Sequence, residues 1–290
     1  MTDLLLYLDF MNNDDDNMPL TFDHCFDRSS GSLSLFCRDL DRWPFSLPKP
    51  VDVHVIDANH NQFRHIPDEV FACHELRRLY VMGNQLVKIP DAIEAFRHLE
   101  FLDLSFNPIR QISQSIGKLA KLRSLVVCGG NLESVPASIG RLTNLRHLLI
   151  GYELTELPAC IGECVRLTRL TLSSNRLTKL PGSLGGLRRL RDLRVDNNLL
   201  REIPDALVNL RDLHFLHAEG NPLQRLPWFA LEMPSLRGLS CCDFCVHPDE
   251  ARRFTDACVD RGLLLLWNRS LCGAPFYQEQ AGDDDRSDHA

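Results

Sequence analysis

No apolar stretch in this 290-residue chain approaches the roughly 18 residues that a membrane-spanning helix requires. Even LLLLW at residues 263–267 is far too short. The N-terminal MTDLLLYLDF has no basic start, and Asp3 and Asp9 interrupt its apolar residues, so it does not fit a secretory signal. We therefore expect a cytoplasmic protein that makes no membrane contact.

Motifs of common enzymes are equally absent. The sequence has no GxGxxG and no GxxxxGK[ST] phosphate-binding loop. HEL at residues 74–76 begins like a zinc-protease motif, but the second histidine is missing. No Ser/His/Asp or Cys/His arrangement stands out either. We expect no enzymatic activity, no cofactor and no resident metal.

The chain also lacks an excess of positive charge, because 32 Lys and Arg stand against 39 Asp and Glu for a net charge of −7. Residues 1–29 carry seven aspartates and one arginine, a charge of −6, and residues 281–290 carry four aspartates and one arginine, a charge of −3. The rest of the chain is left with +2, which is not the basic footprint of a nucleic-acid-binding protein. We expect both acidic ends to be solvated and partly disordered.

What the sequence does contain is an internal repeat. Aligned on its first apolar position, the repeat starts at Ser30, Val53, Leu76, Leu99, Leu122, Leu145, Leu167, Leu190, Leu213 and Leu236. Every interval is 23 residues except the one from Leu145 to Leu167, which is 22. A typical unit, LTRLTLSSNRLTKLPGSLGGLRR at 167–189, has apolar residues at positions one, four, six, eleven and fourteen.

The repeat has a specific physical meaning. Positions four and six face one side of a short strand and positions three and five face the other, because strand side chains alternate. A proline then ends this region, and the PxxIGxL run predicts a short helical or extended return path. One unit cannot bury its leucines alone, but stacked units can. The asparagine at position nine can bond backbone groups of its own and the adjacent unit. This ladder comprises Asn61, Asn84, Asn107, Asn175, Asn198 and Asn221.

These units resemble the leucine-rich repeat family over residues 30 to about 246. The LPxxIGxLxxL form, as in VPASIGRLTNL at 135–145, resembles the intracellular type of Ras-suppressor-like and Scribble-type scaffolds, plant intracellular Ras-group proteins and bacterial type III effectors. The resemblance implies an α/β fold, a right-handed solenoid with a parallel concave sheet of about ten strands and short helical convex segments. It also implies partner binding rather than catalysis.

The ends of the solenoid need caps. The first and last repeats are degenerate and are interpreted as caps, with Phe22 and Phe26 packing beneath the first. HPDEARRFTDACVDRG predicts a C-terminal helix from Pro248 to Gly262, followed by a strand at LLLLW. The expected organisation is an acidic segment (1–29), the solenoid (30–246), a C-terminal cap (247–278) and an acidic tail (279–290).

Cysteine is plentiful, with 11 residues, but their odd number and the missing signal favour free thiols. CCDFC at 241–245, followed by His247, resembles a metal-ligand cluster. In the repeat register Cys241 faces inward, so packing in the core or the cap is favoured. A zinc site and a disulfide are the alternatives.

Outward strand positions are where a solenoid contacts a partner. Repeats three to six expose apolar and aromatic residues there, and repeats eight and nine expose charged ones. The candidate partner-binding residues are Tyr80, Met82, Phe101, Asp103, Phe106, Val126, His147, Leu149, Tyr152, Arg169, Arg194 and His217. An apolar run over four repeats is typical of an interface, although such residues can also simply pack against one another across the sheet.

The short repeat, HLLIGYELTELP at 147–158, lacks the ladder asparagine, and its shortfall lies in the turn between Ile150 and Leu154. We expect an altered turn that presents Tyr152 at the rim of the apolar region. The resulting hypothesis is a non-catalytic scaffold that binds a protein partner on the concave face. The alternative is a recognition or effector module, such as a ubiquitin-ligase adaptor or a bacterial effector secreted into a host cytoplasm. A homodimer through the same surface is a further possibility.

Overall fold

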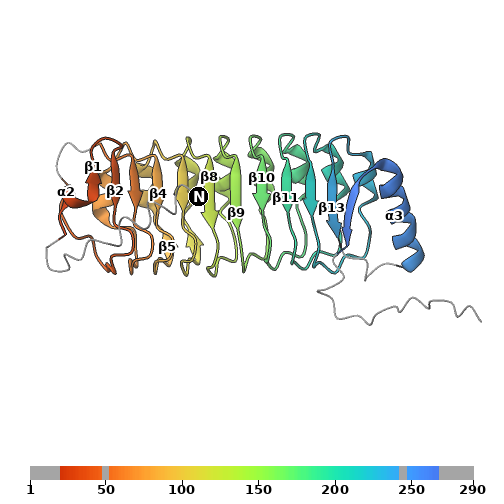
Figure 1. The fold of residues 1–290 in the computed structure, drawn as a ribbon, viewed down its shortest axis with the longest axis horizontal. Helices are drawn as coiled ribbons and strands as arrows, with labels where there is room; N and C mark the ends of the chain where they lie inside the picture. Colours follow the sequence, from red (N-terminus) through yellow and green to blue (C-terminus); the bar gives the residue numbers. More distant parts are fainter. Residues whose placement is uncertain (1–19, 48–51, 242–246, 268–290) are drawn as a thin grey trace, which may run out of the picture.

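The computed structural model describes residues 20–47, 52–241 and 247–267. In this part of the chain the repeats stack side by side, and one long sheet lines one face of the stack (Figure 1). The sheet has 12 strands in chain order, with β5 and β7 left out. Its strands are β1 (Phe26–Asp27), β2 (Ser32–Ser34), β3 (Val55–Asp57), β4 (Arg78–Tyr80), β6 (Phe101–Asp103), β8 (Ser124–Val127), β9 (His147–Ile150), β10 (Arg169–Thr171), β11 (Asp192–Arg194), β12 (Phe215–His217), β13 (Gly238–Cys241) and β14 (Leu264–Trp267).

The sheet is two strands longer than the ten that the repeats predict. Each of the ten repeats supplies one strand, and these ten strands pair in parallel. At one end, β1 adds an antiparallel strand on β2. At the other end, β14 pairs in parallel with β13, with Leu265 opposite Leu239. The sequence after the last repeat therefore continues the sheet.

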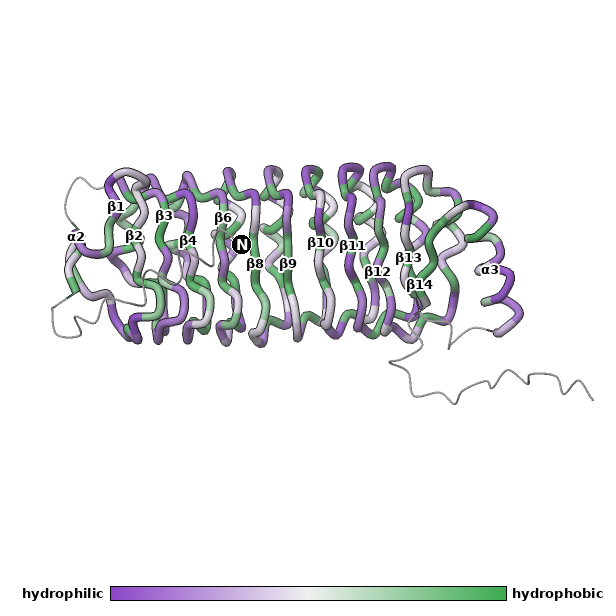
Figure 2. Tube along the Cα trace, in the orientation of Figure 1, coloured by the Kyte–Doolittle hydropathy of each residue, from purple (hydrophilic) through white to green (hydrophobic). Residues whose placement is uncertain are grey.

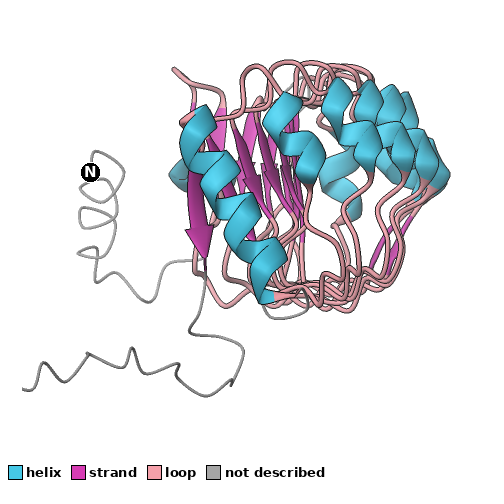
Figure 3. Cartoon of the chain, turned by 90° about the vertical axis from the view of Figure 1, so that its right-hand side faces the viewer, coloured by secondary structure: helices cyan, strands magenta, loops and turns pink. Residues whose placement is uncertain are grey.

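The return paths hold short 3-10 helices, which lie on the opposite side of the core from the sheet (Figure 3). They are η1 (Asp68–Ala72), η2 (Asp91–Ala95), η3 (Gln114–Lys118), η4 (Ala137–Arg141), η5 (Ala159–Glu163), η6 (Gly182–Gly186), η7 (Asp205–Asn209) and η8 (Trp228–Glu232). Proline, with its fixed φ, precedes each helix except η3. Before η3 the hydroxyl of Ser113 accepts a 2.9 Å hydrogen bond from the Ser115 amide. A two-stranded sheet joins β5 (Lys88–Ile89) to β7 (Gln111–Ile112).

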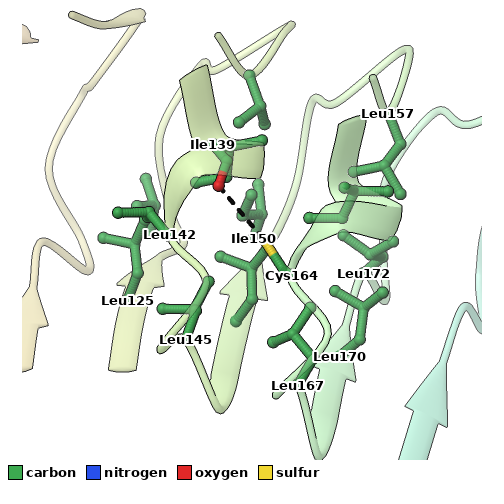
Figure 4. Packing of buried hydrophobic residues seen from close by; sticks show 14 of the residues in the cluster. Leu125, Ile139, Leu142, Leu145, Ile150, Leu157, Cys164, Leu167, Leu170 and Leu172 are labelled. Carbon is green, nitrogen blue, oxygen red and sulfur yellow. Dashed lines mark hydrogen bonds between the residues drawn. The ribbon is translucent and has the colours of Figure 1, made fainter. Parts of the chain in front are cut away.

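The core is a column of leucines and isoleucines, one set from each repeat. Leu167, Leu170 and Leu172 of a single repeat are all fully buried. Burial of such a side chain contributes about 1.5–3 kcal/mol. Cys164 takes the place of a leucine between two repeats, and its thiol donates to the Ile139 carbonyl at 3.2 Å (Figure 4). Cysteine therefore serves as a small apolar residue in this column.

All six ladder asparagines are buried and bond in the same way. In Asn107, the amide nitrogen donates to the carbonyls of Val81, Leu104 and Ser105 at 2.8–3.1 Å. Its oxygen accepts a 2.9 Å bond from the Leu86 amide of the preceding repeat. Each asparagine thus ties the turn of its own repeat to the turn before it.

Both ends of the column are covered. At the start, α2 (Phe22–Cys25) places Phe22 against Phe26, with ring centroids 4.6 Å apart. At the other end, α3 (Pro248–Arg261) crosses the end of the stack (Figure 3). Helix α3 buries Phe254 and Cys258 and ends at Gly262, whose φ of 72° is left-handed. Residues 20–29 of the expected acidic segment are thus part of the folded unit.

Candidate functional site

Two rows of outward side chains run across the sheet, because the parallel strands pair without a register shift. One row contains Arg78, Phe101, Ser124, His147, Arg169, Asp192 and Phe215. The other contains Tyr80, Asp103, Val126, Leu149, Thr171, Arg194 and His217. Nine of the twelve candidate residues lie in these rows. Met82, Phe106 and Tyr152 lie in the turns that follow the strands.

The apolar part of the surface extends over β4 to β9, and we call it the apolar patch; it comprises Tyr80, Phe101, Val126 and Leu149. The Tyr80 and Phe101 rings lie 4.9 Å apart between centroids, with their planes tilted by 37°. Val126 pairs with Leu149 across β8 and β9. All four side chains are half-buried. Mutual packing therefore covers part of each side chain and leaves the remainder exposed on the sheet face.

Asp103 lies between Tyr80 and Val126 in its row, so a carboxylate interrupts the apolar patch. The carboxylate is held in place by Ser105, which donates to it from its amide at 2.9 Å and from its hydroxyl at 2.6 Å. A fixed, half-buried charge among apolar groups is costly to cover unless the covering group supplies a hydrogen-bond donor.

The turn after each strand requires a left-handed residue at position eight. That position has a φ of +53° to +104° in every repeat from the second to the ninth, and it is occupied by His60, Gly83, Phe106, Gly129, Tyr152, Ser174, Asn197 and Gly220. Glycine adopts such angles freely, whereas they are unfavourable for bulky residues. Phe106 and Tyr152 are the two residues in this set with a six-membered aromatic ring, and their φ values are +53° and +104°. Both therefore hold a strained backbone conformation.

The rings of Phe106 and Tyr152 are exposed beside the apolar patch. Phe106 is 58% exposed and Tyr152 is 52% exposed. A Cβ added to Gly129 would lie only 3.0 Å from Cδ1 of Phe106, so the phenylalanine ring lies against the glycine of the next repeat. Neither ring fills the core. Packing thus gives no reason for two aromatic residues where neighbouring repeats use glycine or small polar residues.

The short repeat keeps its core and changes only its turn. Leu148, Ile150, Leu154 and Leu157 are all buried. The Gly151 amide donates 3.0 Å to the Val127 carbonyl. In other repeats the equivalent carbonyl accepts a hydrogen bond from a ladder asparagine, as the Val81 carbonyl does from the Asn107 side chain.

The repeat before it also departs from the ladder. Gly130 occupies the position of the asparagine, and a Cβ there would lie 2.6 Å from the Asn107 carbonyl oxygen. The backbone thus packs directly against the preceding turn, and Asn131 is exposed. Correspondingly, β8 and β9 pair over four residues, including Val127 with Ile150. The altered turns coincide with the stretch that presents Tyr152.

The charged part of the surface is centred on Asp192. Its carboxylate lies 3.5 Å from Arg169, 3.4 Å from Arg194 and 3.9 Å from His217. The Asp192 side chain is only 17% exposed, whereas the two arginines are 62% and 48% exposed. Arginine atoms above a central carboxylate form a mixed-charge cluster in which much of the charge is already paired.

His147 lies between the apolar and charged parts, on β9. The pKa of His147 is lowered, first by partial burial and then by the positive charges of Arg169 and Arg146. The neutral imidazole is therefore favoured at neutral pH, and it can both donate and accept a hydrogen bond.

Some exposed apolar residues on this face are absent from the predicted set. Phe215 is 43% exposed on β12, and Leu264 and Leu266 are 57% and 51% exposed on β14. They lie in the same two rows as the predicted residues. The outward positions of the repeat could have identified Phe215. Leu264 and Leu266 follow the last repeat, where that register no longer applies.

The structure describes only part of the cysteine cluster that resembles a metal site. Cys241 is fully buried, and Cys242 and Cys245 lie outside the described residues. Within residues 20–47, 52–241 and 247–267, no group of three His, Cys, Asp or Glu side chains could hold a metal ion. None of the helices described in these ranges is long and apolar enough to cross a membrane.

Two sequence family models match the repeats. The model described as a leucine-rich repeat region matches residues 90–175, and the model described as leucine rich repeat matches residues 53–109 and 165–223. Together with the solenoid and its long sheet, these matches identify the chain as a leucine-rich repeat protein. No curated protein sequence matches the chain.

Solved structures show the same fold. The leucine-rich repeat ectodomain of the membrane receptor kinase GASSHO1/SCHENGEN3 from Arabidopsis thaliana, in complex with Casparian strip integrity factor 2, is 27% identical with a TM-score of 0.56. The alignment covers 68% of this chain and 26% of the receptor chain. The plant peptide hormone receptor RGFR1, in complex with RGF2, is 25% identical with a TM-score of 0.53, covering 76% of this chain and 41% of the receptor. This chain therefore spans less than half of either receptor chain.

A leucine-rich repeat protein of Leptospira interrogans is similar over 81% of this chain and 95% of its own, at 18% identity and a TM-score of 0.37. The two plant receptors and the family matches are consistent with a protein-interaction module as the class of this chain.

Proposed function

We propose that this chain is a non-catalytic scaffold that binds a protein partner on the sheet face of its solenoid. The observation that carries the proposal is the pair of strained, exposed aromatic residues, Phe106 and Tyr152, beside the apolar patch. Residues held at unfavourable backbone angles without a packing role mark functional surfaces. Aromatic side chains are also the residues that contribute most to protein interfaces.

The division of the surface suggests how the partner is recognised. The apolar patch with Phe106 and Tyr152 anchors an apolar segment of the partner. Asp103 and the Asp192 cluster set its register, because a partner must match their charges to displace water from them. Two plant receptors of similar fold are complexes with Casparian strip integrity factor 2 and RGF2, which supports a polypeptide as the ligand class.

Capture experiments with matched variants test the proposal. The wild-type chain, a Tyr80→Ala/Phe101→Ala variant and a Val259→Ala control are each immobilised. Quantitative mass spectrometry then compares the amount of each protein that the three chains capture. Val259 is 69% exposed on α3, so the control removes an exposed apolar group away from the patch. A partner whose recovery drops at least tenfold with the double variant, and stays within twofold with the control, supports the sheet face. Equal recovery on all three chains contradicts it.

The scaffold and the recognition or effector module differ in whether the ends of the chain are required. Deletion of residues 1–29 is unsuitable for this test, because Phe22 and Cys25 are buried against the first repeats. Deletion of residues 1–19 removes none of the described residues. Unchanged capture after this deletion favours the scaffold, whereas loss of capture favours a module that recruits machinery through its end. Light scattering on the same samples detects a homodimer.

A reducing, cytoplasmic location is part of the proposal. The thiols of Cys73, Cys164 and Cys258 are free and buried. Free cysteines commonly serve as small apolar residues in a core. Alkylation of unfolded protein taken directly from cells tests this point. Complete alkylation without reductant supports a reducing compartment, and protected cysteines contradict it.

A further inference from the structure

A second charged surface lies at the edge of the solenoid where the strands begin. A groove of about 530 Å³ there is lined by Arg146, Arg166, Thr168, Arg189, Arg191 and Asp212. An adjoining hollow of about 530 Å³ shares Arg166 and Arg189 and adds Gly162, Val165, Gly186 and Arg188. Five arginines thus face one aspartate, although the whole chain has a net charge of −7.

The repeat structure sets the spacing of these arginines. The Thr168 amide donates to the Arg146 carbonyl at 2.8 Å, and the Arg191 amide donates to the Thr168 carbonyl at 2.9 Å. The three residues therefore follow one another at the strand spacing of about 4.8 Å. Arg166 and Arg189 occupy equivalent positions before β10 and β11, and both line the groove. The loops that precede β11 and β12 are coloured as hydrophilic in Figure 2.

Most of these guanidinium groups are unpaired within the described residues. Arg166 donates to the side-chain oxygen of Asn144, which carries no charge. In the described ranges the guanidinium groups of Arg146, Arg188, Arg189 and Arg191 make no ion pair or hydrogen bond, and the Arg146 carbonyl accepts a 3.1 Å bond from the Thr168 hydroxyl. All five arginines are exposed. This contrasts with the sheet face, where Asp192 already pairs its arginines.

An apolar hollow adjoins the groove because Gly186, at the end of η6, has no side chain. The last residue of each 3-10 helix is Lys118, Arg141 and Glu163 in η3, η4 and η5, but it is Gly186 in η6. The missing side chain leaves space beside Val165, which is 50% exposed. A small apolar hollow next to unpaired arginines can accept an apolar side chain that neighbours carboxylates.

We propose that the groove around Arg166 and Arg189 is a second binding site, separate from the sheet face, for an acidic polypeptide segment that carries an apolar side chain. Arginine binds carboxylates through paired donors in a fixed geometry, which makes it suited to such a ligand. The apolar hollow at Val165 favours a polypeptide with an apolar side chain over a nucleic acid, which needs a continuous basic track.

Fluorescence anisotropy with a labelled synthetic peptide, EDLEDLEE, tests the site on the full chain. The test variant is Arg166→Gln/Arg189→Gln. The control is Arg176→Gln/Arg225→Gln, which changes the charge equally at the opposite edge, where these arginines pair with Glu153 and Glu202. We expect the test variant to bind at least tenfold more weakly and the control to stay within twofold of wild type. The uncharged peptide QNLQNLQQ is expected not to bind.

Further arms separate the alternatives. Val165→Ser is expected to remove the preference for EDLEDLEE over EDSEDSEE. Tyr80→Ala/Phe101→Ala is expected to leave peptide binding unchanged, whether or not the sheet face binds a partner. Equal weakening by test and control variants, or no binding to wild type, overturns the site. Tighter binding of an eight-nucleotide oligothymidylate than of EDLEDLEE overturns the assignment to a polypeptide. Thermal melting of each variant confirms that it is folded.

Discussion

The side-chain amide of Asn198 donates a 2.8 Å hydrogen bond to the carbonyl of Leu172 in the preceding repeat. Asn198 also accepts a 3.0 Å bond from the Leu177 amide, and it is 4% exposed. Replacement by alanine leaves the buried Leu177 amide without its acceptor, whereas the Leu172 carbonyl keeps a 2.9 Å bond from Asn175. An unpaired buried backbone group costs about 1–3 kcal/mol. We predict that Asn198→Ala lowers the free energy of unfolding by about 2 kcal/mol in urea denaturation.

Asn131 supplies the matched control for the ladder. It is the asparagine displaced by one position in its repeat, and it is exposed. Asn131→Ala should change the free energy of unfolding by less than about 0.5 kcal/mol, as is usual for surface positions. Equal losses for Asn131→Ala and Asn198→Ala would show that the buried bonds do not hold the turns together.

Phe106 should be replaceable by glycine without loss of stability. Its φ of +53° is unfavourable for phenylalanine and is accessible to glycine, which occupies the same position as Gly83 and Gly129. We predict that Phe106→Gly leaves the free energy of unfolding unchanged or raises it by up to about 1 kcal/mol, while partner capture falls. Calorimetry and the capture assay on one preparation measure both. A drop of more than 2 kcal/mol would show that Phe106 has a structural role.

Thiol chemistry should follow burial. Burial raises the pKa of Cys73 and Cys258 to about 11, and burial, followed by Cys160 and Glu163, raises that of Cys164 to about 12. Since the thiolate is the reactive form, these three should resist a thiol reagent at pH 8 until the protein unfolds. Cys37 is exposed and should react first. Mass spectrometry of a timed alkylation gives the order, and early labelling of Cys164 would contradict the described core.

His147 should titrate below the usual histidine pKa of about 6.5. Partial burial is the largest cause, and Arg169 is the next. Arg169→Gln should therefore raise the midpoint only part of the way to the usual value, as followed by NMR. Because the folded-state pKa is lowered, the unfolded chain takes up the proton first as the pH falls. The contribution of His147 to stability is thus present above the usual pKa and is lost as the pH falls below it. A midpoint above 6.5 would refute this.

Much of the fold could be predicted from the sequence, because the repeat converts residue order directly into position. The period of 23 residues places Leu170 and Leu172 inside and Asn175 at the turn, and it places the equivalent residues of most other units in the same way, so one unit predicts its neighbours. Features beyond the period could not be predicted in this way. The antiparallel pairing of β1 with β2 depends on a segment that precedes the repeats, whereas the strand predicted at LLLLW is confirmed as β14.

The candidate surface could be predicted as a set of positions but not as an energetic arrangement. Alternation along the strands predicts that Tyr80 and Leu149 face outward. It does not reveal that Asp192 pairs with Arg169 and Arg194 on neighbouring positions, since charge pairing depends on side-chain conformation. Nor does it reveal the left-handed angle of Phe106. The repeat pattern does not predict the arginine groove, because the groove residues lie in loops between the helix pattern and the strand pattern.

The most direct test of the sheet face is site-specific photocrosslinking with p-benzoylphenylalanine. Placed at Tyr152, which is 52% exposed beside the apolar patch, this aromatic residue substitutes for an aromatic one. Placed at Val259 on α3, it serves as the control. If the sheet face binds the partner, the chain labelled at position 152 forms a crosslink to the captured partner and the chain labelled at position 259 does not. A crosslink from position 259 with none from position 152 would contradict the account.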